Sequence, residues 1–416
     1  MMHNPCMARR VLCLAAVLVA AAAAQVLTAQ PGPQTLALVG GRVIPAPDAT
    51  PLDDAVVLIG NGRIAAVGSR TRIAIPDGST VIDCRGLVVV AGFQNSHVHF
   101  TEPQWNDAAT QPAPALTARL QAMLTSHGFT TVVDTGSFLQ NTVALRRRID
   151  AGEVAGPRIL TAGRPMYPPD GIPFYLKDGS LPPEIVRGLP QPSTARESQA
   201  AVAANIAGGA DVIKLFTGSW VERGRVLPMS APLAAAAAQE AHRHGRPVFS
   251  HASSPAGLDV AISAGVDVIA HALDETAGLT PEHLTRMRQR KMALIPTLTL
   301  FAEDRDAPAI FKEVRDYAAL GGDLLFGTDV GFHQMYDPRL EFASLVRAGL
   351  SWRQVLASLT TVPARRLEPG RARGRVARGL AGDVVVLGGD PALDPLAFTD
   401  VRWTIGAGRV IFQRGR

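Results

Sequence analysis

Polar side chains that can bind a metal ion stand at the ends of several apolar stretches of this sequence. The stretch VAGFQNSHVHF, residues 90–100, ends in His97 and His99. Because the side chains of a strand alternate between its two faces, these two imidazoles point to the same side. A core strand gains nothing from two imidazoles on one face, whereas a metal ion would bind both. The spacing therefore predicts a metal site at the end of this strand.

Four more apolar stretches contain a polar residue at the corresponding place, and these residues are Lys214, His251, His271 and Asp329. Imidazole and carboxylate together suit Zn²⁺ or a similar divalent ion. Four histidines and one aspartate exceed what a single tetrahedral catalytic zinc requires, and two ions sharing the site would use them all. A buried ammonium beside two cations would be repelled, so Lys214 fits only as a neutral amine or as an anionic carbamate formed with CO₂.

The elements that must position these residues repeat along the middle of the chain. Apolar, β-branched stretches alternate with Ala-rich helical ones, and the eight apolar stretches are residues 87–100, 129–137, 158–165, 211–219, 247–253, 266–273, 292–300 and 324–332. Eight strands alternating with helices predict an α/β protein with a (β/α)₈ TIM-like barrel. Catalytic groups of such barrels lie at the C-terminal ends of the strands, which is where all six polar residues fall.

The two ends of the chain differ from the middle. Short alternating strands with tight turns fill both ends, including a hairpin signal at Gly60–Arg63 and a Gly-rich turn at Gly406–Gly408. We expect them to form one small β-sandwich built from both ends. The expected organisation is a signal peptide (1–29), the first part of the β-domain (30–86), the barrel (87–370) and the second part of the β-domain (371–416).

Charge and targeting signals limit the classes of function. The formal net charge is +5, but Arg residues are scattered rather than clustered on one helix, which argues against nucleic-acid binding. Arg9 and Arg10 precede an apolar, Ala-rich run that ends in small residues, as in a secretory signal peptide. We therefore expect an exported protein, periplasmic or secreted, with no stable membrane span after cleavage. Its oligomeric state is open, and a homo-oligomer is one of the expected forms.

The ordered set of motifs resembles the amidohydrolase superfamily, in particular its imidazolonepropionase-like and prolidase-like branch. AGFQNSHVHF resembles the first strand of that family, and GADVIKLFTGS its lysine strand. FSHAS, AGVDVIAH and LLFGTDVG resemble the strands with the later histidines and the aspartate. The family often has Asp where Asn95 stands, a difference that would affect the support of the ligands rather than the ligands themselves.

The resemblance implies a role for each of the six residues. His97, His99 and Asp329 would bind one metal ion, His251 and His271 a second, and a carbamate on Lys214 would bridge the two. The expected cofactors are therefore two divalent ions, with Zn²⁺ as the favoured metal, and CO₂ as the carbamate. A bridging hydroxide would attack the substrate carbonyl, and Asp329 would move its proton to the leaving amine. The partner would be a small-molecule or dipeptide substrate: a dipeptide, an N-acyl amino acid or a cyclic amide.

Several alternatives remain open at this point. The same site could hydrolyse a lactone or a phosphotriester, or the chain could be a periplasmic binding protein that has lost turnover. A mononuclear deaminase-like site would leave Lys214 without a role. The connection from Met166 to about Ser193 is rich in Pro and Gly and is a candidate lid or substrate loop. Weaker candidates for substrate binding are Tyr167 and Tyr175 in this connection and His333, which follows the last strand.

Overall fold

The computed structural model describes residues 35–415, with gaps at 179–182, 368–369 and 371. The predicted signal peptide, residues 1–29, lies outside the described residues, so export stays a prediction. Among the residues that are described, no helix is both long enough and apolar enough to cross a membrane.

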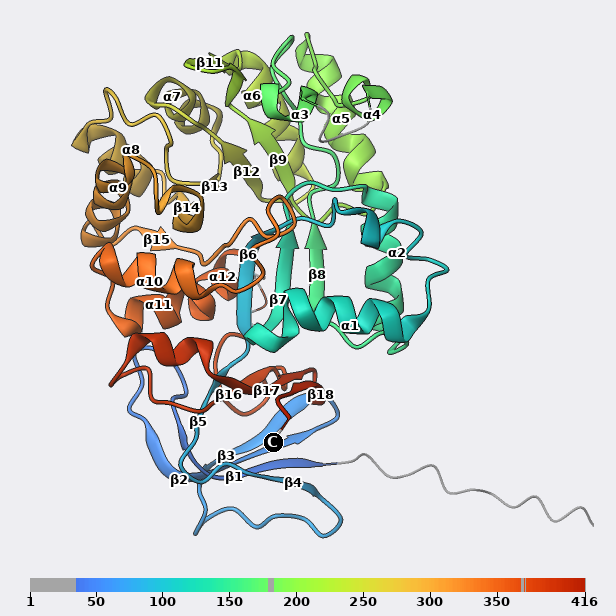
Figure 1. Ribbon diagram of the computed structural model, residues 1–416, viewed down its shortest axis with the longest axis vertical. Helices are drawn as coiled ribbons and strands as arrows, with labels where there is room; N and C mark the ends of the chain where they lie inside the picture. The colour runs from blue at the N-terminus through green and yellow to red at the C-terminus, as the bar shows by residue number, and fades with distance from the viewer. Residues whose placement is uncertain (1–34, 179–182, 368–369, 371, 416) are drawn as a thin grey trace, which may run out of the picture. The chain divides into compact units, whose positions relative to one another are not determined.

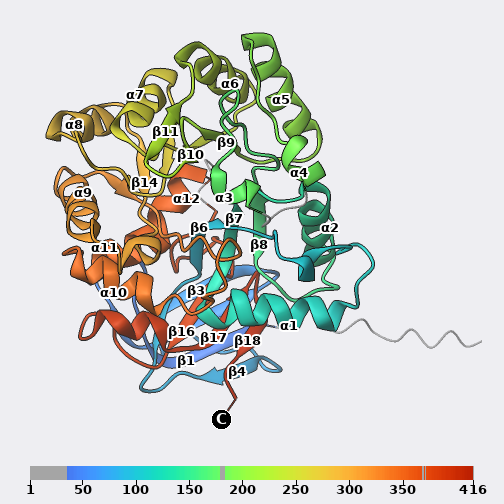
Figure 2. The ribbon, with the colours of Figure 1, turned by 45° about the horizontal axis from the view of Figure 1, so that its top comes forward.

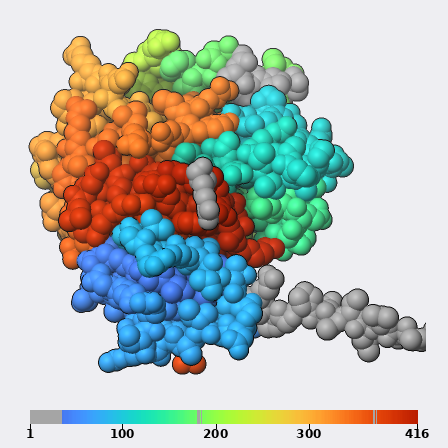
Figure 3. Space-filling model, turned by 60° about the horizontal axis from the view of Figure 1, so that its bottom comes forward, coloured from blue at the N-terminus to red at the C-terminus, as the bar shows by residue number. Residues whose placement is uncertain are grey.

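One mixed sheet contains strands from both ends of the chain, and Figure 3 shows N-terminal and C-terminal residues side by side. Its strands are β1 (Leu36–Val43), β2 (Leu52–Gly60), β3 (Arg63–Ser69), β4 (Thr80–Asp83), β5 (Val88–Ala91), β16 (Val384–Leu387), β17 (Val401–Gly406) and β18 (Arg409–Gln413). They pair in the order β18-β17-β16-β5-β1-β2-β3, and β4 pairs with β1. The predicted pairing of the two ends is confirmed, whereas a two-layer sandwich is not and stays a prediction.

The predicted hairpin signals fold as turns of this sheet. Asn61 and Gly62 join β2 to β3 with positive φ angles of 52° and 73°. Ala407 and Gly408 join β17 to β18 in the same way, with φ angles of 47° and 76°. Two successive residues with positive φ are typical of a two-residue turn whose twist matches that of the flanking strands.

Eight parallel strands form the centre of the chain (Figure 1). They are β6 (Phe93–Val98), β7 (Phe129–Asp134), β8 (Arg158–Thr161), β9 (Ile213–Phe216), β12 (Val248–His251), β13 (Val268–Ala270), β14 (Ala293–Ile295) and β15 (Asp323–Leu324). Strands β6, β7 and β8 form one sheet, and β9, β12, β13, β14 and β15 form another. The Met166 backbone pairs with Leu215 between the sheets on one side, and Val98 pairs with Val330 on the other. Full closure of a barrel stays a prediction.

Helices lie outside these strands, as Figure 2 shows. The longer ones are α1 (Ala113–Met123), α2 (Leu139–Asp150), α5 (Ala195–Ala207), α6 (Ala231–Arg243), α7 (Pro255–Ala264), α8 (Pro281–Gln289), α9 (Ala307–Ala319), α10 (Arg339–Arg347), α11 (Trp352–Leu359) and α12 (Thr361–Leu367). Shorter segments are α3 (Phe174–Lys177), α4 (Pro183–Arg187), η1 (Pro103–Trp105), η2 (Thr125–His127), η3 (Leu298–Phe301) and η4 (Pro395–Thr399), and the hairpin β10 (Gly218–Glu222) and β11 (Arg225–Pro228) follows β9. The predicted alternation of strands and helices is confirmed.

The first apolar stretch, predicted as a single strand, is divided between two sheets at Gly92. Strand β5 pairs with β1 and β16, whereas β6 pairs with β7. A Cβ atom on Gly92 would lie 2.3 Å from the hydroxyl oxygen of Thr130, so the chain passes here where no side chain fits. Both halves are buried, and the apolar pattern therefore gives no sign of the break. The predicted domain boundaries are not tested by this arrangement.

Candidate metal centre and active-site cavity

His97, His99 and Asp329 converge at the end of β6. The Oδ1 atom of Asp329 lies 3.1 Å from the Nε2 atom of His97 and 3.0 Å from that of His99. One ligand atom from each residue lies within 4.8 Å of those of the others, which is close enough for all three to hold a single ion. His97 and Asp329 are buried, and His99 is partly buried.

Backbone hydrogen bonds hold the triad of His97, His99 and Asp329 in place. Strand β6 and the segment that follows β15 are joined by hydrogen bonds from Asp329 N to His97 O (2.9 Å) and from His99 N to Val330 O (2.8 Å). Asp329 has a left-handed φ of 62°. Gly331 has a φ of 96°, and a Cβ atom there would lie 1.9 Å from the carbonyl oxygen of His99. The close approach that brings Asp329 to the histidines thus requires glycine two residues later.

The remaining predicted ligands line the same cavity as the triad. Neighbouring imidazoles form a chain, with centroid distances of 5.3 Å from His99 to His97, 4.4 Å from His97 to His271 and 4.8 Å from His271 to His251. The Nζ atom of Lys214, a buried residue of β9, lies 5.6 Å from the ring centroid of Phe216, on which His251 stacks. The structure therefore brings all six predicted residues together, while their metal-binding and catalytic roles stay predictions.

Hydrogen bonds orient two of the imidazoles. His99 Nδ1 donates to the carbonyl oxygen of Gly136 at 2.6 Å. His271 Nδ1 lies 2.6 Å from the hydroxyl oxygen of Thr297, and that hydroxyl donates its own proton to Pro296 O at 2.8 Å. The hydroxyl must therefore accept from His271, so Nδ1 bears the proton of the neutral ring. In His271, Nε2 is left with its lone pair, the form in which imidazole binds a metal, whereas Nε2 of His99 faces the carboxylate of Asp329.

The electrostatics of the triad favour a cation. Burial lowers the pKa of His97 to about 3, so its ring is neutral at pH 7. Burial opposes protonation of His99 too, but the hydrogen bond and charge of Asp329 outweigh it and raise the pKa of His99. Neighbouring histidines likewise outweigh burial and hold the pKa of Asp329 well below its usual range. The ionised carboxylate of Asp329 thus faces a neutral His97 and a His99 that it helps to protonate, and a divalent ion would replace that proton among the same three ligand atoms.

Lys214 has the electrostatic character that its predicted modification needs. Burial lowers the pKa of Lys214 to about 7, and the charge of Asp329 offsets this only in part. A large fraction of the side chain is therefore a neutral amine near pH 7, and only the neutral amine can attack CO₂.

Two polar residues form hydrogen bonds that hold the segments next to the predicted ligands in place. The Asn95 side chain accepts from His97 N at 3.1 Å and donates to the Thr328 hydroxyl at 2.8 Å, so it ties β6 to the segment that contains Asp329. Asp134 accepts from Gly136 N at 3.2 Å, closing the turn whose carbonyl group orients His99. This contact makes Asp134 a turn-closing residue.

The cavity in front of these residues has a volume of about 1010 Å³. Its walls are largely apolar, and both Tyr167 and Tyr175 of the long connection line it. The ring of Tyr167 packs on Phe216 at 4.4 Å, and that of Tyr175 on Phe332 at 5.6 Å. Contact of the two tyrosines with a substrate and closure of the connection as a lid both stay predictions.

His333 lies outside the residues that line this cavity. Its Nδ1 atom accepts from Met335 N at 3.2 Å, so Nε2 bears the proton and donates to Thr328 O at 2.8 Å. These bonds hold the loop after β15, and a substrate contact for His333 stays a prediction.

Among the polar residues that line the cavity, sequence reasoning missed Arg164, Trp220 and Asp274. Arg164 is exposed, and the Asn205 side chain holds its backbone through hydrogen bonds of 2.8 and 3.2 Å. The Trp220 indole N–H donates to a carboxylate oxygen of Asp274. Asp274 follows the strand of His271 by only a few residues, and that position at a strand end was the one available signal.

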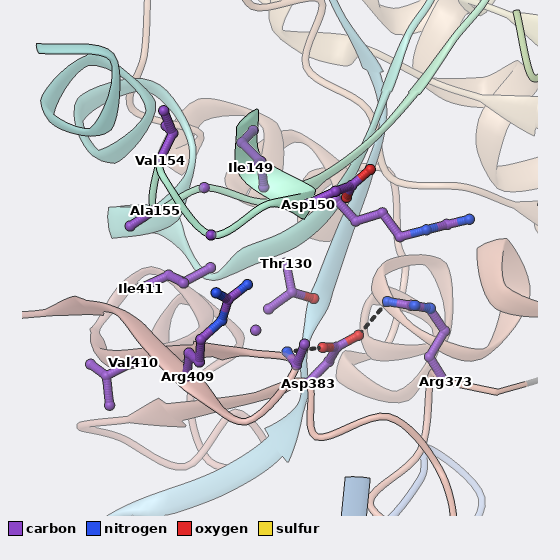
Figure 4. Close-up of a pocket in the computed structure, with 15 residues that line it drawn as sticks. Thr130, Ile149, Asp150, Val154, Ala155, Arg373, Asp383, Arg409, Val410 and Ile411 are labelled. Carbon is purple, nitrogen blue, oxygen red and sulfur yellow. Dashed lines mark hydrogen bonds and ion pairs between the residues drawn. The ribbon is translucent and has the colours of Figure 1, made fainter. Parts of the chain in front are cut away.

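A second cavity, of about 390 Å³, is lined by residues of β8, the end of α2 and the hairpin β17–β18 (Figure 4). Asp383 accepts there from Arg373 at 2.5 Å and from Ala407 N at 2.7 Å. Burial and then the charge of Arg373 lower the pKa of Arg158. The residues that line this cavity include no histidine or cysteine. Its ion pair ties β16 to the segment before it, which is a structural role.

Comparisons with known proteins agree with this architecture. The sequence model of the amidohydrolase family matches residues 88–405. A putative prolidase from Bifidobacterium longum is 27% identical, with a TM-score of 0.75 over 92% of this chain and 95% of that one. A Xaa-Pro dipeptidase with bound methionine in the active site (24%, TM-score 0.78, 92% and 100% covered) and the ochratoxinase of A. niger (21%, 0.75, 92% and 96%) share the fold. These neighbours indicate a TIM-barrel-like α/β fold.

A curated relative matches a shorter part of the chain. An uncharacterised protein of Mycobacterium tuberculosis is 33% identical over 149 residues, which are 34% of this chain and 35% of that protein. The chain thus spans about a third of the length of that relative.

Proposed function

The chain belongs to the amidohydrolase family, and we propose that it is a metal-dependent hydrolase that cleaves an amide or a related carbon–nitrogen bond. The observation that supports this most directly is the convergence of His97, His99 and Asp329, whose ligand atoms lie within 4.8 Å of one another. A divalent ion held there would lower the pKa of a bound water molecule and polarise the substrate carbonyl.

Asp329 is placed to move a proton in this reaction. Its carboxylate lies beside both imidazoles and lines the cavity. We assign to it the role of accepting the proton that the attacking water loses and donating it to the nitrogen of the leaving amine. His97 and His99 hold the carboxylate in place, and burial keeps bulk water away from the transferred proton.

A second ion would use His251 and His271, with Lys214 between the two sets. In the carbamate reaction the Nζ lone pair of Lys214 forms a bond to the carbon of CO₂, and the nitrogen releases one proton to solvent. The product would be an anion with two oxygens, a group that could hold both ions. The lowered pKa of Lys214 supports this step, because the attacking amine has to be neutral.

The cavity suggests substrates with bulky apolar groups. Its volume of about 1010 Å³ lies at the upper end of the range of about 300–1,000 Å³ that is typical of small-molecule sites. Aromatic and aliphatic side chains of the connection after β8 form much of its wall. Together with the prolidase-like neighbours, this favours a dipeptide, an N-acyl amino acid or a cyclic amide as substrate. Export by the N-terminal segment is part of the same proposal.

Two alternatives share the site. A lactone or phosphotriester hydrolase would use the same metal chemistry on another bond, and a binding protein without turnover would keep the barrel alone. All six predicted residues lie in one cavity with the polarity that catalysis needs, which favours an active enzyme over a binding protein.

Metal analysis of the purified protein, with intact mass to detect CO₂ on Lys214, tests the site. We expect about two divalent ions per chain. Hydrolysis of a panel of dipeptides, N-acyl amino acids, lactones and phosphotriesters then tests the reaction. Asp329→Asn should reduce kcat on any cleaved substrate by at least about 100-fold, the usual contribution of a general base. Near-normal kcat in this variant, or a parent chain that binds no metal after reconstitution, would contradict the proposal.

A further inference from the structure

We propose that Asp274, oriented by the Trp220 indole, binds a protonated α-amino group of the substrate. This inference rests on the proposed amide hydrolase function and narrows its substrate class. The enzyme would prefer dipeptides and other aminoacyl compounds with a free amino terminus over N-acyl amino acids. Asp274 would then be a specificity-determining residue rather than a metal ligand.

The backbone presents Asp274 rigidly to the cavity. It follows His271 by three residues, in the loop after β13. Glu313 of α9 accepts from Leu273 N at 2.9 Å, and Ser253 O accepts from Glu275 N at 2.8 Å. The residues on both sides of Asp274 are therefore fixed, and its carboxylate cannot move away from the cavity with the loop.

The carboxylate of Asp274 has a hydrogen-bond donor but no cation. The Trp220 indole donates to one of its oxygens, which sets the plane of the carboxylate. Among the described residues, no Lys, Arg or His forms an ion pair with Asp274. Burial raises the pKa of Asp274 to about 7, and the bond from Trp220 offsets this only in part. A substrate ammonium would supply the missing positive charge and stabilise the ionised form.

The position of Asp274 fits the binding of a substrate α-amino group. In an aminoacyl substrate a single carbon atom separates the amino nitrogen from the scissile carbonyl carbon, so the group that binds the amine has to lie beside the metal ligands. Asp274 lines the same cavity as the predicted ligands and follows His271 by three residues, which agrees with this condition. Tyr175 lines the same cavity as both carboxylates, and burial, then Tyr167, then the charges of Asp274 and Asp329 raise its pKa.

The rest of the cavity fits a dipeptide whose amino end faces Asp274. Arg164 follows β8, the third central strand, whereas Asp274 follows β13, the sixth. The exposed cation and the carboxylate without a cation thus follow different strands around a cavity whose walls are largely apolar. A dipeptide with apolar side chains has charges of the matching signs at its two ends.

The test compares apolar dipeptides with the same dipeptides acetylated at the amino group, using the metal-loaded full chain. Asp274→Asn removes the charge but keeps an acceptor for Trp220. Glu275→Gln is the matched control, because it makes the same charge change one residue further on, outside the cavity lining. We expect Asp274→Asn to lower kcat/KM for the free dipeptides about 10- to 100-fold, mainly through KM, as for loss of a charged hydrogen bond. The acetylated dipeptides and the control variant should change less than about twofold, within ordinary surface effects.

A binding measurement separates this inference from the proposed function. Calorimetry with 2-phenylethylamine and its N-acetyl derivative needs no turnover. If only the free amine binds and Asp274→Asn abolishes its binding, the amine site is established even if no amide is cleaved and the proposed reaction fails. If the parent cleaves acetylated dipeptides at least as well as free ones, or if the amine binds equally to both proteins, the inference is wrong although the hydrolase function stands.

Discussion

Removal of the hydrogen bond between His271 and Thr297 should weaken metal binding by an amount that can be calculated from the structure. The Thr297 hydroxyl accepts from His271 Nδ1 at 2.6 Å and has no other proton to offer, because it donates to Pro296 O. Replacing Thr297 with Val removes this acceptor at nearly constant shape. Both side chains are β-branched, so the left-handed φ of 45° at this position strains them to a similar degree.

Loss of this hydrogen bond in Thr297→Val should lower the affinity for metal and leave the stability of the metal-free protein nearly unchanged. Without metal, the His271 ring can move its proton to Nε2 and escape an unsatisfied donor at Nδ1. With metal, Nε2 must be unprotonated, and the buried Nδ1 proton then has no partner. An unsatisfied buried donor costs about 1–3 kcal/mol, which corresponds to about 5- to 150-fold weaker binding of the ion at His271.

Competition with a chromophoric zinc chelator measures this affinity on metal-stripped protein, and thermal unfolding of the same samples measures stability. Thr297→Ser is the matched control because it keeps the hydroxyl and should keep parental zinc affinity to within a few fold. Zinc affinity of Thr297→Val within twofold of the parent would refute the assignment of His271 as a ligand through Nε2. Equal weakening in the Ser variant would show that the methyl group, not the hydrogen bond, is responsible.

Three other perturbations test the ligand bridge, the supporting loop and the close approach at the site. Lys214→Ala should lower metal content and activity, with partial rescue by short carboxylic acids; two tightly bound ions and full activity would disprove the bridge. Burial raises the pKa of Glu313 from 4.5 to about 8, so the free energy of unfolding should fall as pH rises from about 4.5 to 8. Glu313→Gln should flatten this dependence in urea melts at pH 5 and 8.5, and an unchanged slope would contradict it. Gly331→Ala should lower Tm strongly, because its Cβ atom would lie 1.9 Å from the carbonyl oxygen of His99. Gly349→Ala is the control: its φ of 94° is similar, but beyond its chain neighbours no atom lies nearer than 3.6 Å to the added Cβ, so it should lower the free energy of unfolding by only about 1–2 kcal/mol. Equal losses of stability in the two variants would argue against the close contact at Gly331.

Much of the fold was readable from the sequence because its periodic patterns have direct structural causes. Parallel strands covered on both faces produce the continuous apolar stretches that marked the central elements. Turn residues such as Asn61 and Gly62 adopt the positive φ that a tight hairpin needs, and both predicted hairpins formed. The break at Gly92 could not be read, since both neighbouring strands are buried and the steric reason for it, Thr130, is far away in the sequence.

The candidate ligands could be chosen from the sequence alone, because parallel strands place their C-terminal ends at one edge and a period of two aims His97 and His99 together. Their surroundings depend on the folded chain. Thr297 and Asp274 come from loops and Trp220 from the short strand β10, all outside the repeated pattern of central strands, and each acquires its role from a partner distant in sequence or from burial. Hydrogen bonds and desolvation depend on atoms brought together in space, so the protonation states and the preferences of the cavity arise only in the folded chain.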